Sequence, residues 1–438
     1  GYRAGGKGYF ALNITNPSKL DSAAEAVNQV MWEFTETDDA DLGYSYSEAF
    51  VGMTNATSGT ISSVDSGTVD GSGNTIFTTI NNKQWGVIFG NGYNSTSTDG
   101  DAALYILKVD GGLDHDWTDP GDYIKISTGK GKAESADGLT PNGLSGIRAV
   151  DLDANGTVDY VYAGDYQGNL FRFDLTDSNT SNWNVKLLFS AQIPTTTVKI
   201  SGVTTIVPGV DYPITIRPFV VDHPSETGVI VVAATGSWIT SADATSSTVQ
   251  TIYGIRDDFS ATPTVVASDL VQQAYTLETN VINGFKIREL SNNTINWKNK
   301  DGWYINLSDA KAGERALQLQ TRGGIGFATT ITPKSATSCG SDIESYILAF
   351  DPTTGGVPSL VVFDLNGDNV FNDSDKNGAD LVAGIGLGQS SSPTKIISNL
   401  MIIPLNDGTL KTMGVQVGST NLDGRLSWRE LEVPAGAY

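Results

Sequence analysis

The chain has 438 residues and a formal net charge of -22 at pH 7, from 49 acidic and 27 basic side chains. No cluster of Lys and Arg interrupts this acidic background, which excludes nucleic acid and anionic lipid as partners, since both need a basic face. The 39% hydrophobic content and the 49 glycines are typical of a strand-and-turn protein that buries a core. No apolar run reaches the ~18 residues that span a membrane.

Cysteine and histidine are too scarce for most metal or redox chemistry. Cys339 is the single cysteine, so neither a disulfide within the chain nor a zinc site of paired cysteines is possible. The two histidines, His115 and His223, stand isolated between acidic or turn residues. The chain begins at Gly1 and not at methionine, and we therefore expect a mature product or a fragment of a longer protein.

The N-terminal region predicts a strand, at most one helix and an insertion. GYFALNITNP has the aromatic and β-branched residues of a strand. Leu20–Phe34 carries the Ala and Glu residues typical of a helix, but it has no clear stop signal. Thr54–Asn74 is rich in Ser, Thr and Gly, which predicts an exposed, mobile insertion, and strand signals resume at Thr75.

A hairpin recurs along the rest of the chain, in which two apolar, β-branched and aromatic runs flank a turn of Gly, Asn, Asp or Ser. The hairpins are GVIFGNG with ALYILKVDGG, DYVYAGDYQGNLFRFDL, GVIVVAATGSW with QTIYGIRDD, GIGFATTITP with SYILAFDPTTGG, and NLMIIPLNDGTLKTMGVQV. Their irregular spacing fits propeller blades with long inter-strand insertions better than sandwich domains of ~100 residues. We therefore predict a single all-β propeller domain over residues 1–438.

The first acidic loop, DLDANGTVD, leads from the strand GIRAV into the strand YVYAG. A calcium loop needs oxygen ligands at alternate positions, a turn residue and a closing acid. The predicted ligands are Asp151, Asp153, Asn155, the carbonyl of Thr157 and the closing Asp159, with Gly156 at the turn. The loop resembles the calcium loops of integrin-like propellers and would tie two neighbouring strands of one blade together. The alternative is an Asx-rich turn without an ion.

The second acidic loop, FDLNGDNVFNDSDKNGAD, carries four aspartates and three asparagines between Asp364 and Asp375, with no basic residue among them. These carboxylates repel one another unless a cation neutralises them. The predicted calcium ligands are Asp364, Asn366, Asp368, the carbonyl of Val370, Asn372 and Asp375. Asn369 takes the turn position, where Asn is the best substitute for Gly. An acidic surface turn without an ion is the alternative, and Mg²⁺ is disfavoured because it keeps waters in a strict octahedron.

Taken in order from about Gly5 to Leu431, these and neighbouring segments resemble the C-terminal domain of the PilY/PilC-type adhesins of type IV pilus tips. The matching segments are GKGYFALNITNP, WGVIFGNGYNS, ALYILKVDGG, VDLDANGTVDYVYAGDYQGNLFRFDL, PITIRPFVVDHP, ATGSWITSAD, QTIYGIRDD, GWYINL, ILAFDPTTGG, the Asp364 loop, SSPT and GRLSWREL. The resemblance covers nearly the whole chain.

The resemblance implies a modified seven-bladed β-propeller and a calcium loop that regulates pilus extension and retraction, at the position of the Asp364 loop. The family usually has Asp where Asn372 stands, so Asp373 or Asp375 is an alternative last ligand. No RGD tripeptide occurs, and integrin binding is therefore not implied. The N-terminal portion with which such adhesins contact a host or surface is absent, which agrees with a separated C-terminal part.

The leading hypothesis is a non-enzymatic, calcium-binding module at the pilus tip, outside the cell and secreted through the periplasm. Its expected partners are minor pilins, the N-terminal adhesin portion of the same precursor, and a host or abiotic surface. One alternative is a quinoprotein-like propeller enzyme, because YAGDYQGNLFRFDL resembles its blades, but the eight scattered Trp residues do not reproduce its regular repeats. The other alternative is a purely structural surface or filament protein.

Overall fold

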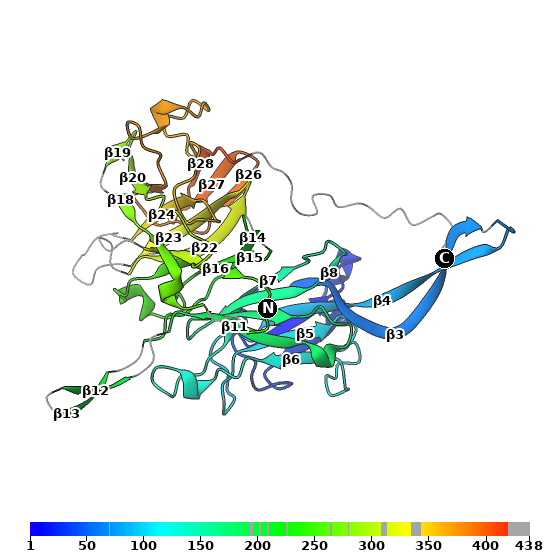
Figure 1. The fold of residues 1–438 in the computed structure, drawn as a ribbon. Coiled ribbons are helices and arrows are strands. Elements are labelled where there is room, and N and C mark those ends of the chain that lie inside the picture. The colour runs from blue at the N-terminus through cyan, green and yellow to red at the C-terminus, as the bar shows by residue number, and fades with distance from the viewer. Residues whose placement is uncertain are drawn as a thin grey trace.

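The computed structural model describes residues 1–69, 71–192, 196–200, 203–207, 210–224, 227–262, 265–278, 280–307, 313–333 and 343–418. Cys339 and the segment GRLSWREL lie outside these ranges. The described chain is built mainly from β-strands (Figure 1), which confirms the all-β prediction. Within it, no helix has the length and apolarity needed to cross a membrane.

A two-stranded sheet opens the fold. Its elements are β1 (Gly8–Leu12), η1 (Pro17–Leu20), α1 (Ala23–Ala26), η2 (Val27–Gln29) and β2 (Val30–Thr35), and β1 pairs antiparallel with β2. The helix expected within Leu20–Phe34 is therefore a single α-helical turn. The second half of that segment forms β2, because Trp32 and Phe34 are buried on alternate positions of a strand.

The next sheet carries a long hairpin. Its order is β6 (Tyr123–Ser127), β5 (Ala103–Lys108), β4 (Thr75–Gly90), β3 (Phe50–Val69) and β8 (Thr157–Val158). The segment Thr54–Asn74, predicted as an exposed, mobile insertion, is strand over most of its length, because the backbone continues as β3 to Val69 and returns as β4. Thr54 and Ala56 are buried, and the far end of the hairpin projects from the body (Figure 1). Frequent Thr and Ile residues favour the strand there.

The remaining strands form four larger sheets and one hairpin. The first two sheets have the orders β11 (Asn184–Ser190), β10 (Asn169–Asp174), β9 (Tyr160–Asp165), β7 (Leu144–Val150), and β14 (Phe219–Asp222), β15 (Val229–Ala234), β16 (Thr251–Asp257), β21 (Gly302–Asn306), β17 (Leu270–Gln273). The third sheet has the order β18 (Tyr275–Leu277), β20 (Phe285–Leu290), β25 (Gly384–Gly386), β24 (Glu344–Phe350), β23 (Ile325–Thr332), β22 (Arg315–Arg322), and β19 (Val281–Ile282) pairs with its β20. The fourth sheet has the order β26 (Lys395–Ile397), β27 (Leu400–Pro404), β28 (Leu410–Gly414), and the separate hairpin consists of β12 (Thr196–Ile200) and β13 (Val203–Val207). Short 3-10 helices are η3 (Lys132–Glu134), η4 (Thr180–Asn182), η5 (Asp243–Thr245), η6 (Ala267–Asp269) and η7 (Asp373–Asp375).

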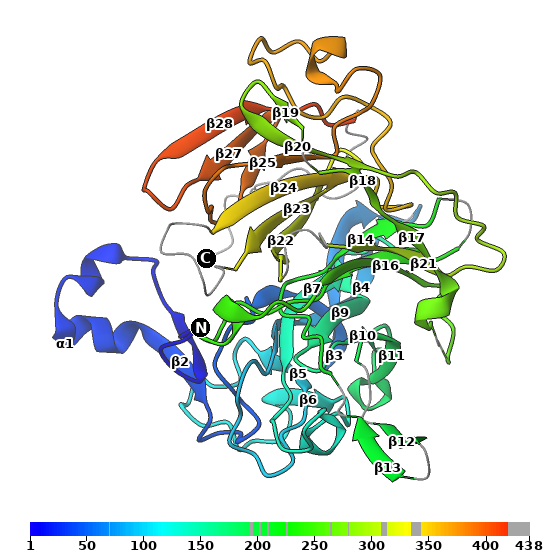
Figure 2. The same ribbon diagram turned by 90° about the vertical axis from the view of Figure 1, so that its left-hand side faces the viewer.

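All five predicted hairpins are present as antiparallel pairs: β4 with β5, β9 with β10, β15 with β16, β23 with β24, and β27 with β28. Aromatic and β-branched residues beside Gly, Asn and Asp turns therefore identified these pairs correctly. In Figure 2 the sheet of β5 and β6 lies in the lower half of the molecule, and the two sheets that contain β24 and β27 lie in the upper half.

The hydrophobic core is divided into clusters that lie between consecutive sheets. The strands β4 and β5 contribute Ile88, Leu104 and Ile106 to one cluster, and β9 and β10 contribute Val161, Phe171 and Phe173 to the same cluster. Later clusters join β9 to β15, β15 to β23, and β23 to β27 in the same way. From the sheet of β4 and β5 to the sheet of β27, successive larger sheets thus pack on one another, as blades do in a propeller.

One buried ion pair fastens β20 to the segment before β22. Arg288 Nη1 and Nη2 donate to Glu314 Oε1 and Oε2 at 2.8 and 2.6 Å, and both side chains are 0% exposed. The guanidinium lies 3.6 Å from the ring centroid of Tyr346 on β24, and Thr330 Oγ donates to Glu314 Oε1 at 2.5 Å. Two parallel hydrogen bonds and a covering ring compensate the cost of burying both charges.

We expect Arg288→Met to lower the free energy of unfolding by about 3–5 kcal/mol, because Glu314 would be left charged and buried. The double replacement Arg288→Met with Glu314→Leu should recover most of that loss. Urea denaturation measures both. Arg3→Met is the control, because that side chain is 75% exposed and its pairing with Glu48 is worth little. Equal stability of the single and double variants would contradict this account of the pair.

Candidate metal centres

The Asp364 loop starts beside β28. Phe363 and Leu365 are buried in the cluster between the sheets of β24 and β27. Between them, the Asp364 N–H donates to the carbonyl of Gly414 at 3.1 Å, and Phe363 forms a bridge with Val415. A Cβ at position 414 would lie 3.0 Å from Asp364 Oδ2, so the glycine there leaves room for the carboxylate.

The first turn of the loop wraps around the Asp364 carboxylate. Oδ1 accepts from the N–H groups of Gly367 and Asp368 at 2.8 and 3.2 Å, and Oδ2 accepts from that of Asn369 at 3.0 Å. Gly367 and Asn369 have φ angles of +78° and +60°, a left-handed conformation that Gly and Asn tolerate best. The turn predicted at Asn369 is therefore present.

The loop closes on Asp375, which lies in η7 and is 1% exposed. Its Oδ1 accepts from the N–H groups of Leu365 and Asn366 at 2.8 and 3.3 Å. The side chain of Asn372 is used differently, since its Oδ1 accepts from the N–H and hydroxyl of Ser374 at 2.8 and 2.7 Å and caps η7. Of the two, Asp375 is the side chain that lies among the other acids.

Carboxylate oxygens of Asp364, Asp368 and Asp375 all lie within 4.8 Å of one another. Asp364 is 4% exposed and Asp368 is exposed. Among the described residues, no Lys or Arg forms an ion pair with any of the three. Lys376 instead pairs with Asp373 at 2.7 Å, and this hydrogen bond and charge lower the pKa of the Asp373 carboxyl. The three clustered carboxylates thus have no side-chain cation beside them in this part of the chain.

The other two predicted ligands of this loop lie at its rim. Asn366 Oδ1 accepts from the Asp368 N–H at 3.0 Å, and its Nδ2 donates to Asp368 Oδ2 at 2.9 Å. The Val370 N–H donates to Asp368 Oδ1 at 2.7 Å, and the Val370 side chain is 55% exposed. A groove of about 330 Å³ borders the loop on the side of Leu400 and Thr412.

The Asp151 loop has a similar construction. Asp151 Oδ1 accepts from the Asn155 N–H at 3.1 Å, and Oδ2 accepts from the Gly156 N–H at 2.8 Å. Ala154 and Gly156 have φ angles of +58° and +91°. The loop connects the neighbouring strands β7 and β9, as predicted. In addition, β8 within it pairs in parallel with β3 of the adjoining sheet, so the loop also joins two sheets.

Asp159 closes this second loop. It is 6% exposed, and its Oδ2 accepts from the N–H groups of Leu152 and Asp153 at 2.8 and 3.4 Å. Carboxylate oxygens of Asp151, Asp153 and Asp159 lie within 4.8 Å of one another. The Thr157 hydroxyl donates to Asn155 Oδ1 at 2.5 Å, so all five predicted residues are gathered in one turn.

Asn55 contacts the second loop, although no motif in the sequence predicted it. Asn55 of β3 is 5% exposed, and its Nδ2 donates to Asp159 Oδ1 at 3.2 Å and to the Val158 carbonyl at 3.1 Å. Its Oδ1 accepts from Lys83 Nζ at 3.2 Å and lies 2.8 Å from Thr157 Oγ. Asn55 and Asp159 are 104 positions apart, and no local pattern in a Ser/Thr-rich stretch marks such a contact.

The two loops share one geometry. In each, the first acid, Asp364 or Asp151, accepts backbone N–H groups from the residues that follow it. The last acid, Asp375 or Asp159, is buried and accepts the N–H groups of the two residues after the first acid. Six of the eleven predicted ligands are therefore assembled as two clusters of three carboxylates. Oxygen-only clusters of this kind suit hard divalent cations.

Comparison with known proteins shows which family has this fold and sequence. A family model described as the PilY1 β-propeller domain matches residues 1–284. The type IV pilus biogenesis factor PilY1 of a Pseudomonas aeruginosa strain is 31% identical over 414 residues, which are 86% of this chain and 31% of that protein. A PilY1 homolog of Xylella fastidiosa is 27% identical over 437 residues, which are 98% of this chain and 29% of that protein. The chain thus spans less than a third of the length of these relatives.

A solved structure agrees with these matches. The crystal structure of the Pseudomonas aeruginosa PilY1 C-terminal domain superimposes with a TM-score of 0.69 at 26% identity, covering 94% of this chain and 78% of that one. The family resemblance and the β-propeller class inferred from the sequence are confirmed, while the number of seven blades stays a prediction. The family match over more than half of the sequence and the shared fold show that this chain belongs to the PilY1 β-propeller family.

Proposed function

We propose that this chain is the calcium-binding propeller of a type IV pilus tip adhesin, in which calcium at the Asp364 loop regulates pilus extension against retraction and surface attachment. The observation that carries the proposal is the cluster of Asp364, Asp368 and Asp375, whose oxygens lie within 4.8 Å with two of the three side chains buried. The names of the relatives, type IV pilus biogenesis factors, support the assignment to pilus biology.

Calcium fits the donor set of the Asp364 loop. Every candidate ligand is an oxygen, and six to eight oxygen ligands in a flexible cage are what Ca²⁺ prefers. The absence of His and Cys from the cluster disfavours the softer transition metals. Asp364 and Asp375 already accept backbone N–H groups, but each carboxylate has further lone pairs for a cation. Asn366, the Val370 carbonyl and Asn372 would complete the ligand shell.

The Asp151 loop is proposed as a second, structural calcium site. Asp151, Asp153 and Asp159 would supply the charge, with Asn155 and the Thr157 carbonyl as neutral ligands. Because β8 pairs with β3 and Asn55 bonds to Asp159, an ion at this loop would strengthen the junction of two neighbouring sheets. This role follows from the position of the loop between blades.

The Asp364 loop could transmit its state through its own far end. Asn377 Nδ2 donates to Glu289 Oε1 of β20 at 2.6 Å, so the end of the loop contacts a neighbouring strand. Without a cation the clustered carboxylates repel one another, and the loop loosens while the packed sheets beneath it stay fixed. A partner that binds the ordered loop would then bind the calcium form better, by a coupling of typically ~1–3 kcal/mol.

The partners proposed for the ordered loop are the minor pilins at the pilus tip. The N-terminal adhesin portion of the same precursor would contact the host or abiotic surface, and the propeller would sit outside the cell between the two. We assign the chain a binding and regulatory role and no catalytic one, in keeping with the names of its relatives.

We expect Asp364→Ala to bind one Ca²⁺ fewer per chain than the parent, because the change removes a ligand and a negative charge. Elemental analysis by mass spectrometry after gel filtration counts the ions. Asp373→Ala is the matched control, since that acid lies in the same loop but pairs with Lys376 and is 89% exposed. Asp364→Asn should have a milder effect, because an oxygen remains. A parental calcium content in Asp364→Ala would refute the site.

Chelation of calcium should lower the melting temperature of the parent, since an ion that binds only the folded state stabilises it by about 2.7 kcal/mol at a hundredfold excess over Kd. Asp153→Ala should lose much of this response to the chelator. Asp222→Ala, which removes an exposed carboxylate at the end of β14, should retain it. If Asp153→Ala responded to the chelator as the parent does, the Asp151 loop would not be a calcium site.

In cells, strains carrying Asp364→Ala should differ from the parent in surface pilus number and in twitching motility. Asp368→Lys places an ammonium in the loop that can imitate a bound cation, so this variant should hold the loop in its cation-bound state. Asp373→Ala should behave like the parent. Piliation is counted by electron microscopy and protein levels by immunoblot. If the Asp364 and Asp368 variants both matched the parent at normal protein levels, the loop would be a structural element and not a switch.

A further inference from the structure

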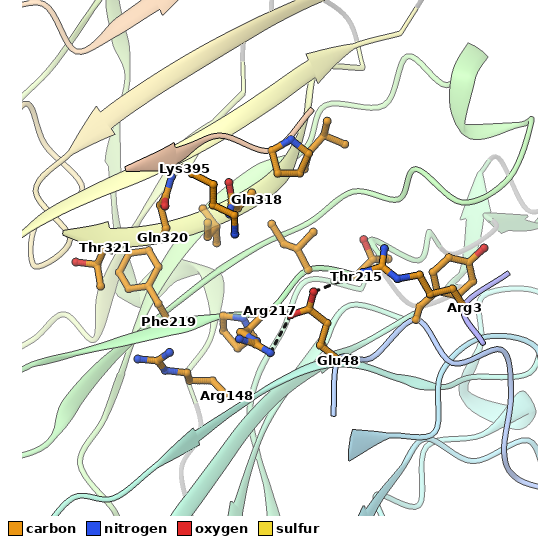
Figure 3. A pocket seen from close by; sticks show the side chains of 17 residues that line it. Arg3, Glu48, Arg148, Thr215, Arg217, Phe219, Gln318, Gln320, Thr321 and Lys395 are labelled. Atoms are coloured by element: carbon orange, nitrogen blue, oxygen red, sulfur yellow. Dashed lines mark hydrogen bonds and ion pairs between the residues drawn. The ribbon is translucent and has the colours of Figure 1, made fainter. Parts of the chain in front are cut away.

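A cavity of about 550 Å³ lies where five separate parts of the chain meet. Its walls come from the N-terminal segment, β7, the residues before β14, β22 and the start of β26. Figure 3 shows their side chains converging on this space from opposite sides. The volume falls in the range of sites that bind one small molecule.

The cavity is basic although the chain is strongly acidic. Its charged lining residues are Arg3, Arg148, Arg217, Lys395 and Glu48, which gives four positive charges against one negative charge, a net charge of +3. The chain as a whole carries -22. Like charges that lie close together repel one another and destabilise the fold. A group of cations in an otherwise acidic protein therefore indicates a role other than stability.

Two of the four cations are already paired. Arg217 Nη2 lies 3.1 Å from Glu48 Oε2, and Arg3 Nη2 lies 3.6 Å from Glu48 Oε1, so one carboxylate lies between two guanidinium groups (Figure 3). Glu48, which is 66% exposed, thus occupies the guanidinium groups of Arg3 and Arg217 at the edge of the cavity.

Arg148 has no such partner. Its Nε is buried without a hydrogen-bond partner, and no carboxylate in the described chain forms an ion pair with it. Gly146, two residues earlier on β7, lets the backbone of Arg217 approach, since a Cβ there would lie 3.0 Å from the Arg217 nitrogen. Burial, and then the charge of Arg217, lower the pKa of Arg148. The protein thus keeps an uncompensated cation where it costs stability.

A second unpartnered group faces the same cavity. Gln318 of β22 has a buried Oε1 without a hydrogen-bond donor. The ladder between β22 and β23 shifts register between Ala316 and Gln318, and such bulges re-aim side chains. An acceptor in need of a donor and a guanidinium in need of an oxyanion therefore line one space.

We propose that this cavity is a binding site for a small oxyanion that also carries hydroxyl groups. The guanidinium of Arg148 binds the oxyanion, a carboxylate or a phosphate, with Lys395 contributing charge from the opposite wall. A ligand hydroxyl donates to Gln318 Oε1. The ligand class is set by these unpaired groups and by the size of the cavity, which accommodates a molecule of monosaccharide size.

Isothermal titration calorimetry with three sugars of one scaffold tests the proposal and distinguishes the two oxyanions. D-Glucuronate offers a carboxylate, D-glucose 6-phosphate offers a phosphate, and D-glucose offers neither. At least one charged sugar should bind more tightly than glucose, and the tighter of the two identifies the oxyanion. If neither charged sugar bound more tightly than glucose, the proposal would be overturned.

Substitution of Arg148 tests whether its guanidinium binds the charged sugar. Arg148→Gln should weaken the charged sugar about tenfold or more, since a hydrogen bond to a charged group is worth about 1.5–3 kcal/mol. Its melting temperature without ligand should equal or exceed that of the parent, which a structural arginine would not allow. Lys186→Gln on β11, outside the cavity, makes the same charge change and should leave binding unaltered.

Lys395→Gln gives a second test that does not depend on a buried position, because Lys395 is exposed. This variant should bind the charged sugar several-fold more weakly than the parent at low salt, with glucose unaffected. Parental affinity in both Arg148→Gln and Lys395→Gln would show that the sugar binds elsewhere and would overturn the site.

Discussion

Repulsion between crowded carboxylates is the constraint that shapes the turns of this molecule. Asp364 and Asp375, or Asp151 and Asp159, can lie close together only because backbone N–H groups point at them from tightly curled turns. Such hydrogen bonds stabilise the charged form of a carboxylate but leave most of the charge in place. These hydrogen bonds hold the carboxylates in position but do not neutralise their charge, so a bound cation would add to the stability of both loops.

In the core, buried charged side chains are neutralised by ion pairs. Arg288 and Glu314 are fully buried with two parallel hydrogen bonds, and Arg172 Nη1 lies 2.6 Å from Asp257 Oδ1 at an equally buried position. Charges are thus neutralised where sheets pack against one another. They remain unbalanced at the acidic loops, and, with the opposite sign, at Arg148 in the cavity between β7 and β22. These unbalanced places are where ligands of opposite charge have most to contribute.

Much of the strand order followed from local pattern, but the course of the chain around the loops did not. The five hairpins were predicted because alternation and turn residues act over a few positions. The strand within Thr54–Asn74 was not predicted, because Ser and Gly outnumber β-branched residues there and the strand depends on cross-strand pairing with β4. Asn372 was predicted as a ligand from its spacing alone, and that spacing did not show that its side chain also caps the start of η7.

The sequence by itself determined the all-β class, the family and the two acidic loops, because a calcium-type loop is a local pattern of oxygens at fixed spacing. Tertiary structure alone decided which acid closes the Asp364 loop, that Asn55 joins the Asp151 loop, and that arginines from distant segments surround one cavity. Contacts of this kind join residues far apart in the chain. They depend on how sheets stack, and no spacing rule in a single sequence encodes that stacking.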